Sequence, residues 1–298
     1  TETRGSIISP SSTCGVVGLR PTYGRISRYG AMGLSWTMDK VGPICRSVED
    51  CTLVFNAIYG SDGRDETIVD APFDWDPYLP LSKLRIAYLK RDFEPQPATA
   101  TPPGVSTMTE EQRKRLEAQR AQREARLKIM NEALDVFRKQ GVKLEPIDLP
   151  DFPSESLNFI LNAEAAAAFD DLTRSKGIDQ LTAQGRGDWP NTFRTQRFVP
   201  AVEYIRAQRA RTLLIRKMEE MMRKCDVFLS PTGGSSLGIT NLTGHPAMCL
   251  KAGFIGDNQP VALMITGRLY DEATLLGVGL AFEQATKWQA MNPKLALT

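Results

Sequence analysis

The sequence predicts an α/β fold, in which strands and helices alternate along the chain. Residues 84–89 alternate apolar and polar side chains with period two, as strands do, and a long helical segment separates them from a second strand at 142–149. A strand, a helix and a further strand in succession imply a parallel crossover connection. Residues 260–267 and 271–285 then predict a late strand and a closing amphipathic helix.

The helix boundaries follow from capping signals. Ser47 begins a helix with the character of a capping box, and Gly60 ends it. Thr109 and Gln112 open the longest helix, which stops near Gly141. The first half of that helix is almost wholly polar, which favours a solvated helix with charge pairs over a surface for an acidic partner.

The remaining elements are assigned from apolar patterns and turn residues. We expect a short helix or turn over 12–19, and an irregular helical region over 151–211 that includes a run of alanines. We expect a loop near a pocket at 189–198 and a clear helix at 205–223. A buried strand at 225–232, a helix or turn at 241–249 and a strand at 250–254 should follow.

Composition sets limits on function. The 298 residues are 42% hydrophobic and 24% charged, with a net charge of +2, which is ordinary for a soluble protein and gives no reason to propose a nucleic-acid partner. No apolar run approaches the ~20 residues of a membrane span. Five scattered cysteines and one histidine make a zinc or redox site an unfavoured assignment. Cys14, Cys51 and Cys249 are predicted to be small core residues in a reducing compartment.

A glycine-containing run of small polar residues opens the chain, T-E-T-R-G-S-I-I-S-P over 1–10, and C-G-V-V-G-L-R-P-T-Y-G-R follows over 14–25. A hydroxyl that attacks an amide carbonyl creates an oxyanion, which needs preorganised N–H donors. A turn with glycine lets several backbone N–H groups converge. Ser6 on this turn is therefore a candidate nucleophile, and a plain surface Gly-Ser loop is the alternative.

These two stretches resemble the amidase signature family, whose pattern reads roughly T-D-T-G-G-S-I-R-x-P and then C-G-V-V-G-L-K-P-T-Y-G-R. Its members hydrolyse amides with a serine nucleophile. The resemblance implies a mixed central β-sheet flanked by helices, with Ser6 as the nucleophile. It also implies that the backbone N–H groups of Thr3, Arg4 and Gly5 form the oxyanion hole, and that no metal or organic cofactor is needed.

The resemblance further implies that the N-terminal part of the domain is missing, because the motif starts at residue 1. The family base is a lysine that acts through a second serine in a cis peptide, and both are expected upstream. No lysine of this chain matches that motif. The 298 residues alone are therefore expected to be inactive and to leave an open sheet edge. His245, which precedes a proline, is expected to have a packing or substrate-side role rather than to act as the base.

Three positions depart from the family pattern. Arg4 stands where the family has glycine, Ile8 where it has arginine, and Glu2 where it has aspartate. If the family's acidic residue and arginine form a support pair, this chain has lost that pair at Ile8. Arg4 would then rebuild it, reach toward a substrate carboxylate or carbonyl, or point to solvent.

We therefore interpret residues 1–298 as a partial amidase signature domain, with a divergent region at 90–225 that specifies the substrate. The implied reaction is hydrolysis of a linear carbon–nitrogen amide bond through a serine acyl-enzyme, with esters or carbamates open to the same chemistry. The partner is a small-molecule amide, a homodimer is left open, and the expected location is cytoplasmic. Two alternatives are a glutaminase like the A subunit of glutamyl-tRNA amidotransferase, and a non-catalytic binding protein that keeps the fold.

Overall fold

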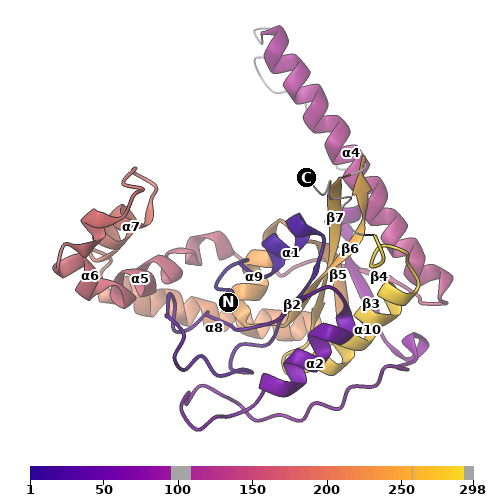
Figure 1. Cartoon of the computed structure of the whole chain (residues 1–298), viewed down its shortest axis with the longest axis horizontal. Coiled ribbons are helices and arrows are strands. Elements are labelled where there is room, and N and C mark those ends of the chain that lie inside the picture. The colour runs from indigo at the N-terminus through magenta and orange to yellow at the C-terminus, as the bar shows by residue number, and fades with distance from the viewer. Residues whose placement is uncertain (95–108, 257, 292–298) are drawn as a thin grey trace, which may run out of the picture.

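A seven-stranded sheet forms the centre of the computed structural model, which describes residues 1–94, 109–256 and 258–291 (Figure 1). The strand order is β2-β1-β6-β7-β5-β3-β4. The strands are β1 (Val17–Arg20), β2 (Ile44–Cys45), β3 (Ile86–Leu89), β4 (Glu145–Ile147), β5 (Val227–Pro231), β6 (Ala247–Ile255) and β7 (Gln259–Gly267).

The sheet is mixed, as the family resemblance implied. Strand β1 is antiparallel to β2 and β6, and β6, β7 and β5 continue the antiparallel pairing. Strand β3 is parallel to both β5 and β4. The long helix between β3 and β4 therefore forms the parallel crossover that the sequence predicted.

Ten α-helices surround the sheet in the part of the chain that the structure describes. They are α1 (Ile8–Cys14), α2 (Val48–Ile58), α3 (Lys90–Phe93), α4 (Glu110–Lys139), α5 (Phe159–Ala168), α6 (Asp170–Arg174), α7 (Trp189–Gln196), α8 (Ala201–Met222), α9 (Ser235–Thr243) and α10 (Glu272–Gln284). Short 3-10 helices occur at Leu81–Lys83, Ser154–Leu157 and Gly177–Gln180. Thr109 and Gln112 form the expected capping box of α4, and the Ser47 side chain caps α2.

The two faces of the sheet carry separate cores because neighbouring side chains on a strand point to opposite faces. On β5, Val227 and Leu229 pack with α2, α4 and α10, whereas Phe228 between them packs with α8. On β6 and β7 the second face offers the small side chains Ala247, Cys249 and Ala262 to α1 and α9. Small residues let these two helices approach the sheet closely, and α1 follows Ser6 directly.

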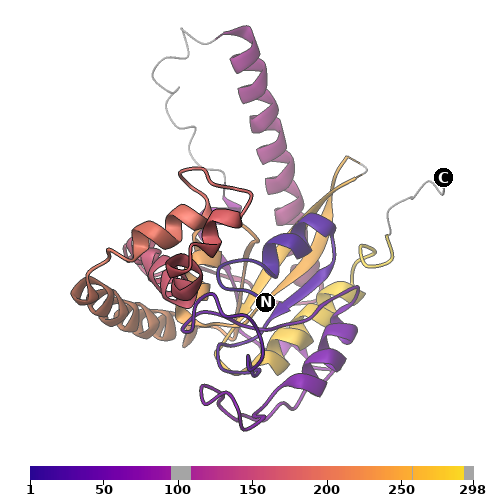
Figure 2. The same cartoon turned by 60° about the vertical axis from the view of Figure 1, so that its left-hand side comes forward.

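Helices α5, α6 and α7, residues 159–196, form a lobe beside the sheet (Figure 2). This α5–α7 lobe has its own small core of Ala165, Ile178 and Phe193, to which Leu34 from the N-terminal third adds an apolar contact. The first turns of α4 extend away from the rest of the molecule, as the polar sequence of that half predicted (Figure 2). A solvated helix surface explains why its apolar stripe begins only near Met130.

Three sequence assignments were wrong in place or kind. The helix expected within 12–19 begins earlier, at Ile8, because the Glu2 carboxylate accepts from the first N–H groups of the helix. Residues 17–20 are a strand because the distant strand β6 pairs with them. The expected loop at 189–198 is mostly helix α7, with a proline in its first turn, where proline is favoured. Over 241–249, helix α9 ends at Thr243, Gly244 caps it with φ of +78°, and β6 begins at Ala247.

The cysteines are all free, and their burial only partly follows the prediction. Cys51 and Cys249 are buried, and burial raises the pKa of both thiols. Cys14 is exposed at the end of α1, so its assignment to the core was wrong. Over 1–94, 109–256 and 258–291, no helix has both the length and the apolar character that crossing a bilayer requires.

Candidate functional site

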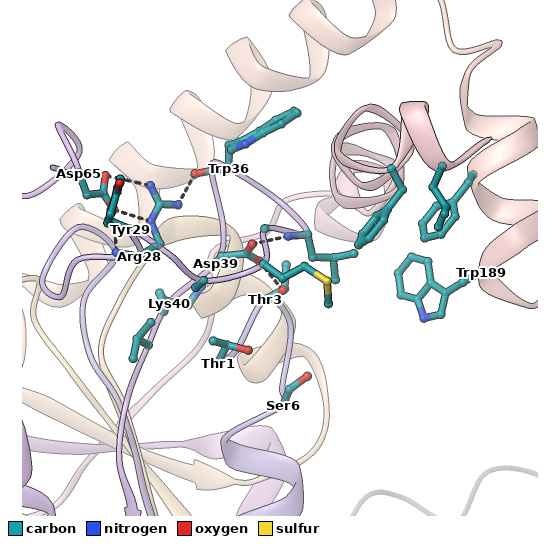
Figure 3. A pocket seen from close by; sticks show the side chains of 18 of the residues that line it. Thr1, Thr3, Ser6, Arg28, Tyr29, Trp36, Asp39, Lys40, Asp65 and Trp189 are labelled. Carbon is teal, nitrogen blue, oxygen red and sulfur yellow. Dashed lines mark hydrogen bonds and ion pairs between the residues drawn. The ribbon is translucent and has the colours of Figure 1, made fainter. Parts of the chain in front are cut away.

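Ser6 lies on an exposed turn immediately before α1, between Gly5 and the fully buried pair Ile7 and Ile8. The two isoleucines fix the turn to the core, and the serine stays accessible. Ser6 lines a pocket of about 990 Å³ together with Thr1 and Thr3, as Figure 3 shows. No side chain in the described part of the chain forms a hydrogen bond with the Ser6 hydroxyl.

The buried carboxylate of Glu2 holds this turn in place. One oxygen accepts hydrogen bonds from the backbone N–H groups of Ile7 and Ile8 at 2.8 and 2.9 Å, which satisfies two donors at the start of α1. The other oxygen accepts from Arg20 and from the Asn241 amide, both at 2.8 Å. One side chain thus ties together α1, β1 and α9 with every bond charge-assisted.

Arg20 is the partner of Glu2 that sequence reasoning missed. Both side chains are fully buried, and the pair is reinforced where Arg20 donates to Thr240 and to the His245 carbonyl. Burial by itself raises the pKa of the Glu2 carboxyl, but the Arg20 charge and the hydrogen bonds outweigh it and leave that pKa below its ordinary value. Of the three roles considered for Arg4, the structure contradicts a replacement of the support pair, since Arg4 lies 3.5 Å from Glu155 on the exposed surface.

The backbone N–H groups of Thr3, Arg4 and Gly5 are not used in hydrogen bonds within the described residues. The Thr3 side chain donates to Asp39 at 2.5 Å, and Glu2 pairs through its backbone with Lys40 at 2.7 and 2.9 Å. The segment around Asp39 therefore holds the turn through both backbone and side-chain hydrogen bonds.

Glycine at two positions permits the close packing of this turn. A Cβ on Gly18 of β1 would lie 2.2 Å from the Ser11 hydroxyl, so α1 can rest on the strand only if this residue is glycine. A Cβ on Gly5 would lie 3.0 Å from the Ser9 hydroxyl and 3.2 Å from Leu237 of α9. The sequence pattern of the turn is thus also a packing requirement.

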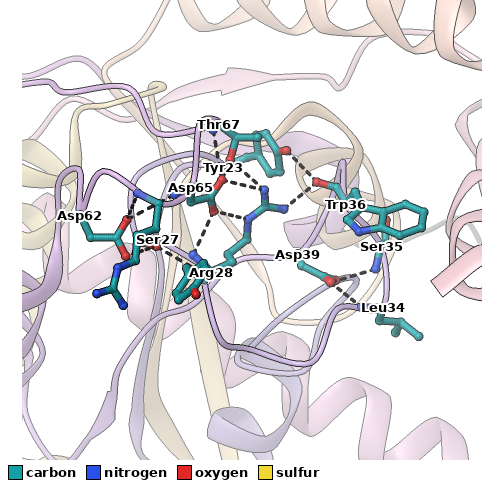
Figure 4. Close-up of polar contacts among 12 residues, drawn as sticks. Tyr23, Ser27, Arg28, Leu34, Ser35, Trp36, Asp39, Asp62, Asp65 and Thr67 are labelled. Carbon is teal, nitrogen blue, oxygen red and sulfur yellow. Dashed lines mark hydrogen bonds and ion pairs between the residues drawn. The ribbon is translucent and has the colours of Figure 1, made fainter. Parts of the chain in front are cut away.

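The loop at 28–41 forms one wall of the pocket, and a polar network fixes it (Figure 4). The Arg28 guanidinium pairs with Asp65 at 3.0 Å, and Arg28 and Tyr23 both donate to the Trp36 carbonyl at 2.6 and 2.7 Å. Asp39 accepts from the N–H groups of Leu34 and Ser35 at 2.7 and 2.8 Å. These contacts set the position of Trp36 at the pocket.

A second buried carboxylate, Glu164 of α5, joins this loop to the α5–α7 lobe. It accepts hydrogen bonds from the Ser35 hydroxyl and from the side chain of Thr37 at 2.7 Å. Tyr204 and Gln208 of α8 donate to it at 2.7 and 3.1 Å. The opposite wall of the pocket comes from this lobe and includes Phe169, Leu172, Leu181, Trp189 and Phe193.

Lys40 is among the residues that line the pocket, and its side chain is buried. Its ammonium group donates to the Met38 carbonyl. Burial, with the nearby Arg20 charge, lowers the pKa of Lys40 well below its ordinary value. No sequence motif had marked this lysine. In the described residues no group of three or more His, Cys, Asp or Glu side chains could hold a metal ion.

His245 is buried and lies outside the residues that line the pocket. Its Nδ1 atom lies 2.8 Å from the Thr243 hydroxyl, and its carbonyl accepts from Arg20. Burial, assisted by the Arg20 charge, lowers the pKa of His245 to about 3. The neutral imidazole is therefore a packing group, which is one of the two roles that the sequence had left open.

The pKa of His245 predicts how stability depends on pH. The unfolded chain binds this proton near pH 6.5 and the folded chain only near pH 3, so the stability is fully present above pH 6.5 and falls by about 1.4 kcal/mol per pH unit below it. Urea unfolding of the wild type and His245→Gln at pH 7 and pH 5 measures this. The stability advantage of the wild type should shrink by about 2 kcal/mol.

Comparing the two proteins removes the contribution of Glu283, whose pKa burial raises to about 7 and which acts in the opposite direction. A difference between wild type and His245→Gln that is the same at both pH values would contradict a buried neutral His245.

This fold, and the sequence of the turn that carries Ser6, are similar to those of known proteins. A model of the Amidase family matches residues 1–237. The A subunit of the glutamyl-tRNA(Gln) amidotransferase of Chloroflexus aggregans is 31% identical over 343 residues, which cover 99% of this chain and 64% of that protein. The solved peptide amidase of Stenotrophomonas maltophilia is 23% identical with a TM-score of 0.70, over 95% of this chain and 61% of that one. A bacterial aryl acylamidase is 20% identical with a TM-score of 0.70, over 97% and 62%.

At 20% and 23% identity, the similarity to these two solved structures shows that the chain shares their fold. The chain spans about 64% of the length of the curated relatives that it matches. The family model matches well over half of the chain, including the whole turn at 1–6 that carries Ser6. The chain therefore belongs to the amidase signature family.

Proposed function

We propose that the protein hydrolyses a linear amide bond through an acyl-enzyme on Ser6. The observation that supports this most is the turn at 3–6. It presents an accessible serine hydroxyl to a pocket, and a buried carboxylate and two buried isoleucines hold it rigidly. A nucleophile on such a turn is preorganised, so little conformational entropy is lost when it attacks.

In this mechanism Ser6 Oγ attacks the carbonyl carbon and its proton passes to a base. The N–H groups of Thr3, Arg4 and Gly5 are the proposed donors to the oxyanion, and their lack of acceptors among the described residues supports this role. The carbon–nitrogen bond then breaks, the amine leaves with a proton, and water hydrolyses the acyl-serine. Esters and carbamates pass through the same acyl step.

The base is proposed to be the family's lysine, which acts through a second serine, and both are expected upstream of Thr1. A serine is a weak nucleophile until a base takes its proton. We therefore expect residues 1–298 to be inactive by themselves. Glu2, Arg20 and Asp39 are positioning residues in this scheme, because they hold the turn and do not touch the reacting atoms.

A glutaminase of an amidotransferase is the second candidate, and the 31% identity to an amidotransferase protein favours it. Such a protein would release ammonia from glutamine in a complex with its partner subunits. The third candidate is a non-catalytic protein of this fold, whose support is Arg4 in the family's glycine position. That substitution leaves the Arg4 N–H in place, and the Arg4 side chain is engaged with Glu155.

The experiment is intact-mass measurement of the natural protein before and after a serine-reactive fluorophosphonate. Ser6→Ala is the test variant and Ser9→Ala is the control, because Ser9 is an exposed serine on the same segment. A single adduct in the wild type and Ser9→Ala, absent in Ser6→Ala, supports an activated Ser6. A mass above 33.0 kDa would show a longer protein that can supply the base.

No adduct on a protein of the relatives' length would overturn the hydrolase proposal and favour the non-catalytic alternative. The cytoplasmic location and the homodimer stay predictions.

A further inference from the structure

The pocket beside Ser6 has one wall built from stacked aromatic rings. Phe193 of α7 lies 4.9 Å from Phe169 and 5.5 Å from Trp189 between ring centroids, with interplanar angles of 21° and 27°. Phe193 is almost fully buried, whereas Trp189 is 44% exposed at the open end of the stack. Figure 3 shows Trp189 across the pocket from Ser6. This wall is an apolar platform that is already ordered.

The facing wall is also apolar at its surface. Met32, Leu34 and Trp36 line it, and Trp36 is 54% exposed. The Glu164 bonds to Ser35 and Thr37 hold the residues on both sides of Trp36. A flat group between Trp36 and Trp189 would therefore lose little of its binding energy to reordering of the protein.

Four of the six charged residues that line this pocket, Arg28, Asp39, Lys40 and Asp65, are already bonded to other groups. Arg28 is paired with Asp65 and also donates to the Trp36 carbonyl. Asp39 accepts from Thr3, Leu34 and Ser35, and the Lys40 ammonium donates to Met38.

Two further charged residues, Arg64 and Glu66, are exposed, and the Arg64 guanidinium lies over the Tyr29 ring at 5.0 Å. A zwitterionic amino acid such as glutamine needs a cation and an anion placed for its two charges. The four bonded residues could serve it only if their present bonds broke, which is costly for buried groups. Arg64 and Glu66 are exposed, so solvent screens their charges and each would hold a ligand charge only weakly.

We propose that this pocket selects uncharged amides that carry an aromatic or bulky apolar group, and that Trp189 is a specificity-determining residue. The proposal rests on the proposed function, since it names the substrate class of the same site. The volume of about 990 Å³ accommodates an aromatic ring and an amide together. The proposed preference distinguishes this chain from a glutaminase, because the pocket walls are apolar and a glutaminase must bind a zwitterion.

The test is binding of two primary amides to the natural protein with Ser6→Ala, measured by calorimetry. The ligands are 4-phenylbutyramide and L-glutamine. Both contain a primary amide, but the first carries a neutral phenyl ring and the second carries an ammonium and a carboxylate group. We expect 4-phenylbutyramide to bind at least about tenfold more tightly, and Trp189→Ala to weaken its binding by about tenfold. Trp288→Ala is the control, since Trp288 packs against Phe254 away from the pocket.

Glutamine binding as tight as 4-phenylbutyramide binding would overturn the proposal. So would equal losses in Trp189→Ala and Trp288→Ala, or no binding of either amide at millimolar concentration. Fluorophosphonate labelling keeps the two proposals apart. A ring preference without labelling retains the pocket assignment and removes the hydrolase, whereas labelling of Ser6 with glutamine preferred retains the hydrolase and removes the pocket assignment.

Discussion

Glu2→Gln is expected to lower the free energy of unfolding by about 3–5 kcal/mol, the usual cost of removing one partner from a buried ion pair. Arg20 would keep its charge without a counterion in a site closed to solvent. A glutamine side chain also has one acceptor oxygen, whereas the Glu2 oxygens accept from Ile7, Ile8 and Asn241 as well. Urea unfolding at pH 7 measures the change.

A double-mutant cycle separates the pair from the other bonds. Glu2→Gln with Arg20→Met should cost clearly less than the sum of the two single changes, because no unpaired charge then remains. Glu155→Gln is the control, since it breaks the exposed contact with Arg4 and should change stability by less than about 1 kcal/mol. Additive effects in the cycle would contradict the assignment of Glu2 and Arg20 as a coupled pair.

Glu272→Gln is expected to have a comparable effect, about 3–5 kcal/mol, at a second ion pair that is fully buried among the described residues. Glu272 accepts from Arg25 at 3.1 Å and from the Thr22 N–H at 2.8 Å, and Arg25 also donates to Pro72 at 2.8 Å. The Arg25 guanidinium lies 4.8 Å from the centre of the Tyr59 ring. This cluster joins α10 to the loops after β1 and α2.

Thermal and urea unfolding of the wild type and of Glu272→Gln measure this change in the free energy of unfolding. Arg25→Lys should not preserve stability, because a lysine cannot supply the several directed bonds of the planar guanidinium. Glu145→Gln, which breaks the exposed contact with Lys143, should leave the unfolding free energy nearly unchanged. A small effect of Glu272→Gln, similar to that of Glu145→Gln, would show that water reaches the pair.

Local signals in the sequence were reliable where the structure depends on neighbours in the chain. The capping box at Thr109, the cap at Ser47 and the alternation near Ile86 each involve residues within a few positions, so their patterns are complete in the sequence. The assignment failed at 12–19, where the cap of α1 is a carboxylate several positions upstream and the strand partner is 229 residues away, Leu19 with Met248.

The sequence by itself determined the α/β class, the parallel crossover at α4 and, through the family pattern, the turn that carries Ser6. The tertiary structure alone decided that Arg20 rather than Arg4 supports Glu2, and that Trp36 and Trp189 line one pocket. The physical reason is that hydrogen bonding within a helix or turn is set by near neighbours. Charge pairing and pocket walls instead join residues up to hundreds of positions apart, and their contacts exist only once the sheet has brought those residues together.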